Sequence, residues 1–218
     1  MNYDKWTFGG GVSVGKRWTP NFAILTLSGG LNTSFVRNSY DADLYTPVSS
    51  VIAENHGKFG IANTLWTSFS LDDRDIYYDP SKGWFASQRF SLVGLIPEKE
   101  SEYYLRSDTK GELYFTLFQR QISETWTLKF VLAGYSGLSF VFPTFSDKIE
   151  DDGYLYIDGM FNGRGWGNLE TYQNRGNAMW SSYLELRMPI ATGVFALDFF
   201  GDAVAVKENP KDLFTNLT

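Results

Sequence analysis

Apolar and polar residues alternate with a period of two along most of the chain, and this alternation predicts β-strands. Between Leu105 and Leu117 the odd positions are largely apolar, while the even positions include Arg106, Asp108, Lys110 and Glu112. We expect the charged face of this strand to point into an interior and the apolar face to point outward. The same alternation recurs in about eight segments, at residues 5–17, 22–38, 59–72, 83–96, 102–118, 125–142, 177–190 and 193–206.

These segments are long enough to cross a membrane. A tilted transmembrane strand needs about 9 to 11 residues, whereas a strand of a soluble protein usually has about 5 or 6. A soluble β-sandwich also alternates polar and apolar residues, but it rarely needs so many strands of this length. Aromatic residues gather near the expected strand ends, as in the interfacial belts of membrane proteins: Trp18, Phe22, Tyr103, Tyr104 and Trp126. The sequence therefore predicts an all-β transmembrane antiparallel up-and-down β-barrel, with residues 1–218 as a partial barrel domain.

The connections between the expected strands alternate in length. Short turns are expected at residues 16–21 and 119–124, whereas the connections 39–58 and 143–176 are long. Transmembrane barrels have short periplasmic turns and longer outer loops. This order places 39–58, 97–101 and 143–176 outside the cell, although the link 97–101 is short for an outer loop.

Composition narrows the class of protein further. Charged residues make up 20% of the chain and aromatic residues 17%, and no stretch approaches the roughly 20 apolar residues that a membrane-spanning helix needs. The absence of cysteine excludes a disulfide framework, a thiol nucleophile and a cysteine metal site, and it fits an oxidising compartment. With a net charge of -6 and no cluster of Lys and Arg, the chain is not expected to bind nucleic acid.

No group of residues predicts catalysis, a metal site or a cofactor. The single histidine, His56, lies in a polar loop without a nucleophile beside it, which favours a surface role. The glycines at 9–11 and 15 lie within an expected strand and lack the helix of a phosphate-binding loop, so small residues facing a crowded interior explain them better. The acidic pairs at 72–73 and 151–152 occur in turn-like segments, where solvated carboxylates are expected.

The long connection 143–176 contains the most informative segment, Gly163-Arg164-Gly165-Trp166. Glycines let the backbone turn sharply, and an arginine that leaves solvent needs carboxylates arranged to meet its planar guanidinium. Glu185 lies on the polar face of the next expected strand, and the strand after it presents Asp198 and Asp202. We expect Arg164 to fold into the barrel interior and to pair with Glu185 and with Asp202 or Asp198. The alternative is an exposed arginine in a mobile outer loop.

These residues resemble a known family. Gly163-Arg164-Gly165-Trp166 is similar to the Val-Arg-Gly-Phe/Tyr motif of the BamA-type outer-membrane protein assembly factors, with Gly163 and Trp166 departing from the usual residues. Three further segments are similar to the family in order and spacing, at 71–83, 176–189 and 199–203. The resemblance implies that Arg164 is the motif arginine, that Glu185 and Asp202 are its acidic partners, and that Asp198 is a weaker candidate.

The resemblance also implies a fold and a function. The family barrel has about sixteen strands, of which this chain would supply roughly the sixth to the thirteenth, with the periplasmic POTRA domains and the remaining strands outside it. The sequence lacks a signal peptide, which also points to a mature or internal fragment. The implied protein lies in the bacterial outer membrane, is not an enzyme, and inserts unfolded outer-membrane protein clients into the lipid bilayer. Its expected partners include the lipoproteins of the assembly machine, which it would contact through the periplasmic domains.

Two rival functions remain at this point. A related translocator of the TamA or two-partner secretion type would carry a similar arginine loop. An outer-membrane enzyme, such as a phospholipase or a protease, is also compatible with a barrel, although no histidine lies on an expected strand face.

Overall fold

The computed structural model describes residues 3–47, 50–94, 103–124, 126–143, 153–159, 162–164, 175–191 and 195–215. These residues form one eight-stranded antiparallel sheet in the order β1-β2-β3-β4-β5-β6-β9-β10. Its strands are β1 (Asp4–Trp18), β2 (Ile24–Ser39), β3 (Gly60–Asp72), β4 (Gly83–Val93), β5 (Tyr104–Gln121), β6 (Thr127–Pro143), β9 (Ala178–Ala191) and β10 (Phe195–Lys207). The all-β, up-and-down prediction is confirmed, because the eight long strands form one continuous sheet and not the two layers of a sandwich.

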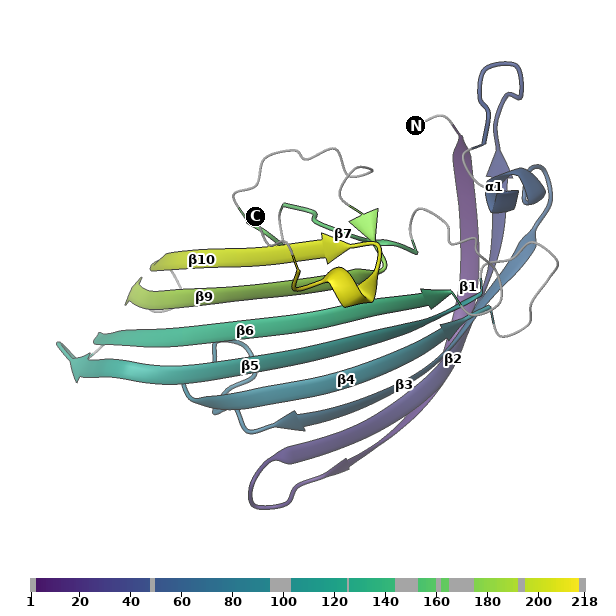
Figure 1. Ribbon diagram of the computed structural model, residues 1–218. Coiled ribbons are helices and arrows are strands. Elements are labelled where there is room, and N and C mark those ends of the chain that lie inside the picture. The colour runs from purple at the N-terminus through teal and green to yellow at the C-terminus, as the bar shows by residue number, and fades with distance from the viewer. Residues whose placement is uncertain are drawn as a thin grey trace.

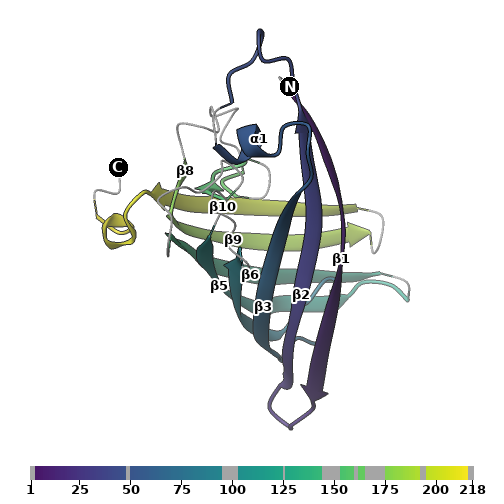
Figure 2. The same ribbon diagram turned by 90° about the vertical axis from the view of Figure 1, so that its right-hand side faces the viewer.

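The sheet is curved and open. Figure 1 shows the strands following one another along a curve from β1 to β10, and Figure 2 shows the same curve from the side of β1. Within the described residues, β1 and β10 lie at the two edges, so the sheet is a partial barrel and not a closed one. We call its concave face the inner face and its convex face the outer face.

The strand bounds agree with the sequence prediction to within a few residues, and the differences lie at strand ends. β1 extends to Trp18 and β5 to Gln121, so the turns expected at 16–21 and 119–124 are shorter than predicted. The sequence did not predict four short elements in the connections, because none is long enough to show a period. They are α1 (Ser50–Glu54), β7 (Leu155–Tyr156), β8 (Arg175–Gly176) and the 3-10 helix η1 (Pro210–Asp212).

The two faces of β5 differ as the alternation predicts. Leu113, Phe115 and Leu117 are 53%, 56% and 60% exposed on the outer face. Glu112 and Tyr114, which lie between them in sequence, are buried on the inner face. The charged residues of this strand therefore point to the interior of the partial barrel. A bulge between Thr116 and Phe118 places a second aromatic side chain outward near the strand end.

The antiparallel order places the connections 40–59, 94–103 and 144–177 at one end of the sheet, as predicted, although 97–101 lies outside the described residues. His56 is exposed in the first of them, with its ring centroid 4.0 Å from that of Tyr40. In β1 and β2 small residues occur where strands approach closely: a Cβ at Gly30 would lie 2.8 Å from Cβ of Ser13. No helix in the described part of the chain is long and apolar enough to cross a membrane.

A small apolar cluster attaches the long connection to the sheet. Leu155 of β7 is 3% exposed and packs with Tyr104, Val141 and Met179, which come from β5, β6 and β9. β7 also pairs with β8, which directly precedes β9. The connection between β6 and β9 is therefore held against the sheet at β7.

Candidate functional site: a lumenal arginine

Two glycines with a left-handed backbone precede Arg164. Gly159 and Gly163 have φ angles of 71° and 68°, a left-handed conformation that favours glycine. Between them, the backbone N–H of Asn162 donates to Oδ1 of Asp158 at 2.8 Å. Arg164, which follows Gly163, contacts side chains of β9 and β10 on the inner face of the sheet. The requirement for glycine before the motif arginine is thus conformational at Gly163.

Arg164 binds two carboxylates from two adjacent strands. Its Nε and Nη2 donate to the two carboxylate oxygens of Asp202 on β10, at 2.9 and 2.8 Å, and its backbone N–H donates to Oδ2 of the same residue at 2.8 Å. Its Nη1 lies 2.5 Å from Oε1 of Glu185 on β9. This is the forked geometry that arginine uses to hold carboxylates.

The contact lies deep within the partial barrel. Glu185 is seven residues beyond Ala178, where β9 begins, which corresponds to about 23 Å of strand at roughly 3.3 Å per residue. The side chains of Glu185 and Asp202 are 9% and 4% exposed, and that of Arg164 is 27% exposed. The arginine therefore reaches the middle of the sheet and not its rim.

Neighbouring groups complete the charge balance around Arg164. Arg187 pairs with the second oxygen of Glu185, with Nη2 2.7 Å from Oε2. The Arg164 guanidinium also lies over two aromatic rings, 4.1 Å from the centroid of Phe200 and 4.8 Å from that of Tyr183. Hydrogen bonding to Asp202, and then to Glu185, raises the pKa of Arg164 above its usual range despite the opposing effect of burial, so the side chain stays charged.

The structure brings together three of the residues that sequence analysis selected and separates others from them. Arg164, Glu185 and Asp202 form one cluster. Among the described residues no ion pair joins Asp198 to Arg164, because Asp198 lies exposed nearer the other end of β10. Gly165 and Trp166 lie outside the described residues.

A second arginine, Arg74, was missed in the sequence. It lies in the turn 73–82 between β3 and β4, and its Nε and Nη2 donate to the two oxygens of Asp72, both at 2.8 Å. Its Nη1 donates to Oε2 of Glu112 on β5 at 2.9 Å. Asp72 is the last residue of β3 and is 24% exposed, so the expectation of a solvated loop carboxylate is wrong for Asp72. Asp151 and Asp152 lie outside the described residues.

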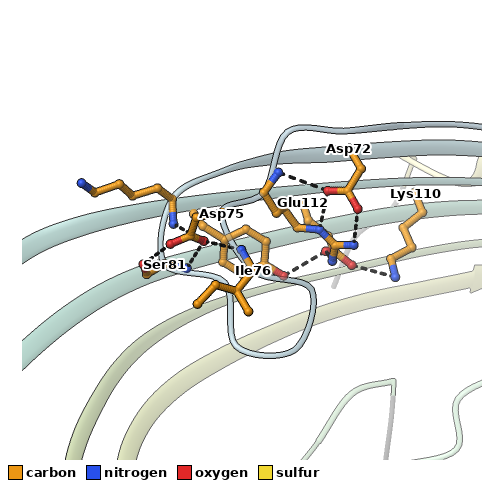
Figure 3. A network of polar contacts seen from close by, with 9 residues as sticks. Asp72, Asp75, Ile76, Ser81, Lys110 and Glu112 are labelled. Carbon is orange, nitrogen blue, oxygen red and sulfur yellow. Dashed lines mark hydrogen bonds and ion pairs between the residues drawn. The ribbon is translucent and has the colours of Figure 1, made fainter. Parts of the chain in front are cut away.

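Figure 3 shows Asp72, Glu112 and Lys110 close together beside the turn that carries Asp75, Ile76 and Ser81. Lys110 Nζ lies 2.7 Å from Oε1 of Glu112. The signal in the sequence was Asp72-Asp73-Arg74, since a carboxylate two residues before an arginine at a strand end can meet it on one face, together with the charged face of β5. The contact between Arg74 and Glu112 could not be predicted because 38 residues separate them along the chain.

The chemistry of both clusters is ionic and structural. Every partner named above is a carboxylate, a guanidinium, an ammonium group or an aromatic ring, and none is paired with a nucleophile. In the described part of the chain, no three His, Asp or Glu side chains converge as metal ligands would. The arrangement can hold a loop and a turn against the inner face of a sheet.

Comparisons with known proteins agree with this fold. Residues 1–216 match the Omp85 superfamily domain. A relative from Treponema pallidum (strain Nichols), named provisionally as an outer membrane protein assembly factor, is 38% identical over 213 residues, which cover 94% of this chain and 25% of the relative. The crystal structure of BamA from Haemophilus ducreyi lacking POTRA domains 1-3 has a similar fold, with a TM-score of 0.59 at 19% identity over 93% of this chain and 42% of that one. The chain spans a quarter of the first protein and less than half of the second.

Proposed function

This chain belongs to the Omp85 superfamily and is part of a bacterial outer-membrane barrel, and on that premise we propose that it forms the section of an outer-membrane protein assembly factor that receives an inward-folded loop. The observation that carries the proposal is the contact of Arg164 with Glu185 and Asp202 in the middle of the sheet. Such a contact fixes the connection between β6 and β9 inside the lumen, where it orders the barrel interior during client insertion.

The rest of the proposal concerns partners. The outer face, with exposed side chains such as Leu113 and Phe115, contacts the lipid bilayer. Clients are unfolded outer-membrane proteins, because strand edges of a barrel can template the pairing of an incoming strand. Lipoproteins of the assembly machine bind through periplasmic domains outside this chain. The end of the sheet that carries the connections 40–59, 94–103 and 144–177 faces the outside, and the protein acts without catalysing a reaction.

The test is mutagenesis of the clamp in the complete protein. Arg164→Ala and Glu185→Ala should each lower the amount of folded client barrels in the outer membrane, since each strands an opposite charge in a buried site. The double variant should be less impaired than the sum of the two, because the residues act as a unit. Asp198→Ala is the matched control, since Asp198 lies on the same strand as Asp202 but does not pair with Arg164.

Client measurements also separate assembly from translocation. If the protein is an assembly factor, cells with the Arg164→Ala variant should contain less of many different outer-membrane barrels. If it is a translocator, the variant should fail to export one class of passenger protein and leave the amounts of the barrels unchanged. Normal levels of every client barrel in Arg164→Ala, with the variant present in the membrane at wild-type amounts, would contradict the proposal.

A further inference from the structure

Arg74 and Arg164 sit in the same arrangement of contacts. Each arginine holds both oxygens of one aspartate with Nε and Nη2 and also donates its backbone N–H to that aspartate. Each directs Nη1 at one glutamate, whose other oxygen binds a second cation. We call Arg74, Asp72, Glu112 and Lys110 the turn clamp, and Arg164, Asp202, Glu185 and Arg187 the loop clamp.

The likeness extends to aromatic rings. Arg74 lies 4.5 Å from the ring centroid of Phe85 and 5.3 Å from that of Tyr77. Arg164 lies at 4.1 Å from Phe200 and 4.8 Å from Tyr183. A desolvated guanidinium over aromatic faces gains cation–π attraction in addition to its ion pairs. Both arginines are thus placed by the same four kinds of partner: an aspartate, a glutamate, a phenylalanine and a tyrosine.

The turn clamp holds a segment that folds onto the inner face from the opposite end of the sheet. The turn 73–82 joins β3 to β4, whereas the loop joins β6 to β9, and antiparallel order places these connections at opposite ends. Arg74 fixes the beginning of the turn to Glu112 of β5. Near its end, Oγ1 of Thr116 on β5 donates to the carbonyl of Ser81 at 2.9 Å. The turn is therefore attached at both ends to a strand that is not its own.

Tyrosines connect the two clamps. The hydroxyl of Tyr114 donates to Oε2 of Glu112 at 2.9 Å, and the guanidinium of Arg187 lies 5.6 Å from the same tyrosine ring. In parallel, the rings of Tyr135 and Tyr183 stack with centroids 4.7 Å apart. Lys110 lies 5.8 Å from the Tyr135 ring and Arg164 lies 4.8 Å from the Tyr183 ring. Two bridges of aromatic contacts thus run from one clamp to the other.

The bridges connect two clusters whose charges are balanced. Each clamp contains two carboxylates and two cations, so each is neutral as a whole. Glu112 and Glu185 are 6% and 9% exposed, and each serves two cations. Displacing Arg74 would leave Glu112 with Lys110 and Tyr114 alone. These groups would then shift toward the remaining charge and move the rings on which Arg187 and Arg164 rest.

We propose that Arg74 is a second positioning arginine, and that the turn clamp sets the place of the Arg164 loop in the lumen through Tyr114 and the Tyr135–Tyr183 stack. The two ends of the barrel interior are then coupled, so that a change at the turn is felt at the loop. The importance of this coupling for client assembly rests on the proposed function, whereas the coupling itself is a property of the fold.

The experiment measures the loop directly, in the complete protein folded in membranes. Tyr156 of β7 is 42% exposed, and a Tyr156→Cys variant reports the position of the loop by its rate of maleimide labelling. Arg74→Lys keeps the charge but loses the forked contact with Asp72, and Glu112→Gln keeps the shape but loses the charge. Each should raise the labelling rate by about 2- to 30-fold, the range for couplings carried by packed networks.

Arg89→Lys is the matched control. Arg89 also lies on the inner face, over the Trp66 ring at 4.4 Å, and it belongs to neither clamp. Its variant should label at the wild-type rate. The double variant Arg74→Lys with Arg164→Lys should label more slowly than the product of the two single effects predicts, because both changes release the same loop.

Two outcomes would overturn the inference. In one, Arg164→Lys raises labelling while Arg74→Lys and Glu112→Gln leave it unchanged. In the other, the Arg89 control raises labelling as much as the clamp variants do, which indicates general loosening. Neither outcome touches the proposed function, which is judged from client barrels and from Arg164 variants alone.

Discussion

The loop clamp and the turn clamp share their contacts but differ in where the partners come from. Arg164 takes its aspartate from a strand 38 residues later, whereas Arg74 takes its aspartate from two residues before it. The Arg164 side chain is 27% exposed and that of Arg74 is 9% exposed. The turn clamp therefore needs only the three consecutive strands β3, β4 and β5, while the loop clamp cannot form until β9 and β10 are paired. Local contacts form at a lower entropic cost than distant ones, so we expect the turn to be set before the loop.

The inner face of the sheet also differs between its first strands and its later ones. Both clamps lie on β3 to β10, and the inner face of the first strands carries mainly small uncharged residues. On β1 and β2 these inner positions include Thr7, Gly9, Gly11, Ser13, Gly15, Thr26, Ser28, Gly30 and Asn32, with Lys5 and Arg17 on the same face at the two ends of β1. Inward-facing carboxylates are thus concentrated on the part of the sheet against which the described connections fold. Buried charge is costly unless it is paired, and a connection that brings an arginine supplies the partner.

The largest expected effect tests whether the clamps are equivalent. Glu112→Ala and Glu185→Ala should each lower the free energy of unfolding by about 3 to 5 kcal/mol, because each leaves two cations around a buried gap. Tryptophan fluorescence during urea titration of the complete protein in liposomes measures this quantity. Asp108→Ala is the control on β5, since its pair with Arg106 is 30% and 36% exposed and should be worth about 0 to 1 kcal/mol. If Glu112→Ala lowers the free energy of unfolding by no more than Asp108→Ala does, the two clamps are not equivalent.

A second prediction tests the faces on which the comparison depends. Leu113 is the neighbour of Glu112 in sequence but lies on the outer face, 53% exposed. Leu113→Arg should cost about 2 to 4 kcal/mol, as a charge does at the lipid-facing midplane of a barrel. Ser70→Arg, on the inner face of β3, should cost much less by the same titration. Equal costs at the two positions would mean that the register of the inner and outer faces is wrong.

Sequence reasoning reached the strands and the loop clamp for a physical reason. Alternation with a period of two is imposed on every strand that separates lipid from a polar interior, and it survives without knowledge of the partners. The role of Arg164 could be predicted because glycines flank it and because Glu185 and Asp202 lie on the two long strands that follow it. The identity of its second carboxylate was left between Asp198 and Asp202, since residues four apart on a strand share one face. The position along the strand that Arg164 reaches decides between them, and the sequence does not show how far the loop extends into the barrel.

The turn clamp could not be predicted, because its local sequence is typical of a solvated turn. Asp72 ends β3 and Arg74 lies in the turn that follows it, and most charges in turns are solvated. What removes them from solvent is the folding of the turn 73–82 onto β5, a strand two positions away in chain order. Alternation along β5 predicted that Glu112 faces inward but could not specify which cation meets it there.

A smaller effect tests the bridge between the clamps. Tyr114→Phe removes the hydroxyl that donates to Glu112 and keeps the ring beneath Arg187. It should cost about 0.5 to 1.5 kcal/mol, the net worth of one hydrogen bond, because Arg74 and Lys110 still satisfy the carboxylate. Tyr183→Phe is the control, since the Tyr183 hydroxyl makes no hydrogen bond within the described residues. Identical losses in the two variants would assign the effect to the rings and not to the hydroxyl of Tyr114.

The smallest expected effect concerns a feature of the turn itself, the carboxylate of Asp75. Burial raises the pKa of this group, but hydrogen bonds from the Ser81 hydroxyl and from the backbone N–H groups of Ser81, Lys82 and Ile76 outweigh burial and lower the pKa to about 2. The folded pKa lies below the unfolded value of about 3.9. Stability from this carboxylate is therefore fully present above pH 4 and is lost as the pH falls through about 2.

Acid should therefore loosen the turn around Asp75 late, well after ordinary carboxylates have been protonated. The carboxyl carbon of Asp75, followed by NMR in the complete protein labelled with ¹³C-aspartate, should titrate with a midpoint near 2. Asp75→Asn removes the titration and identifies the signal. Ser81→Ala takes away the hydroxyl that donates to Oδ2 and should move the midpoint upward, toward the unfolded value. A wild-type midpoint near 4 would mean that the turn is open in solution, and the burial of Arg74 in the turn clamp would then lose its support, since the same ten residues position both groups.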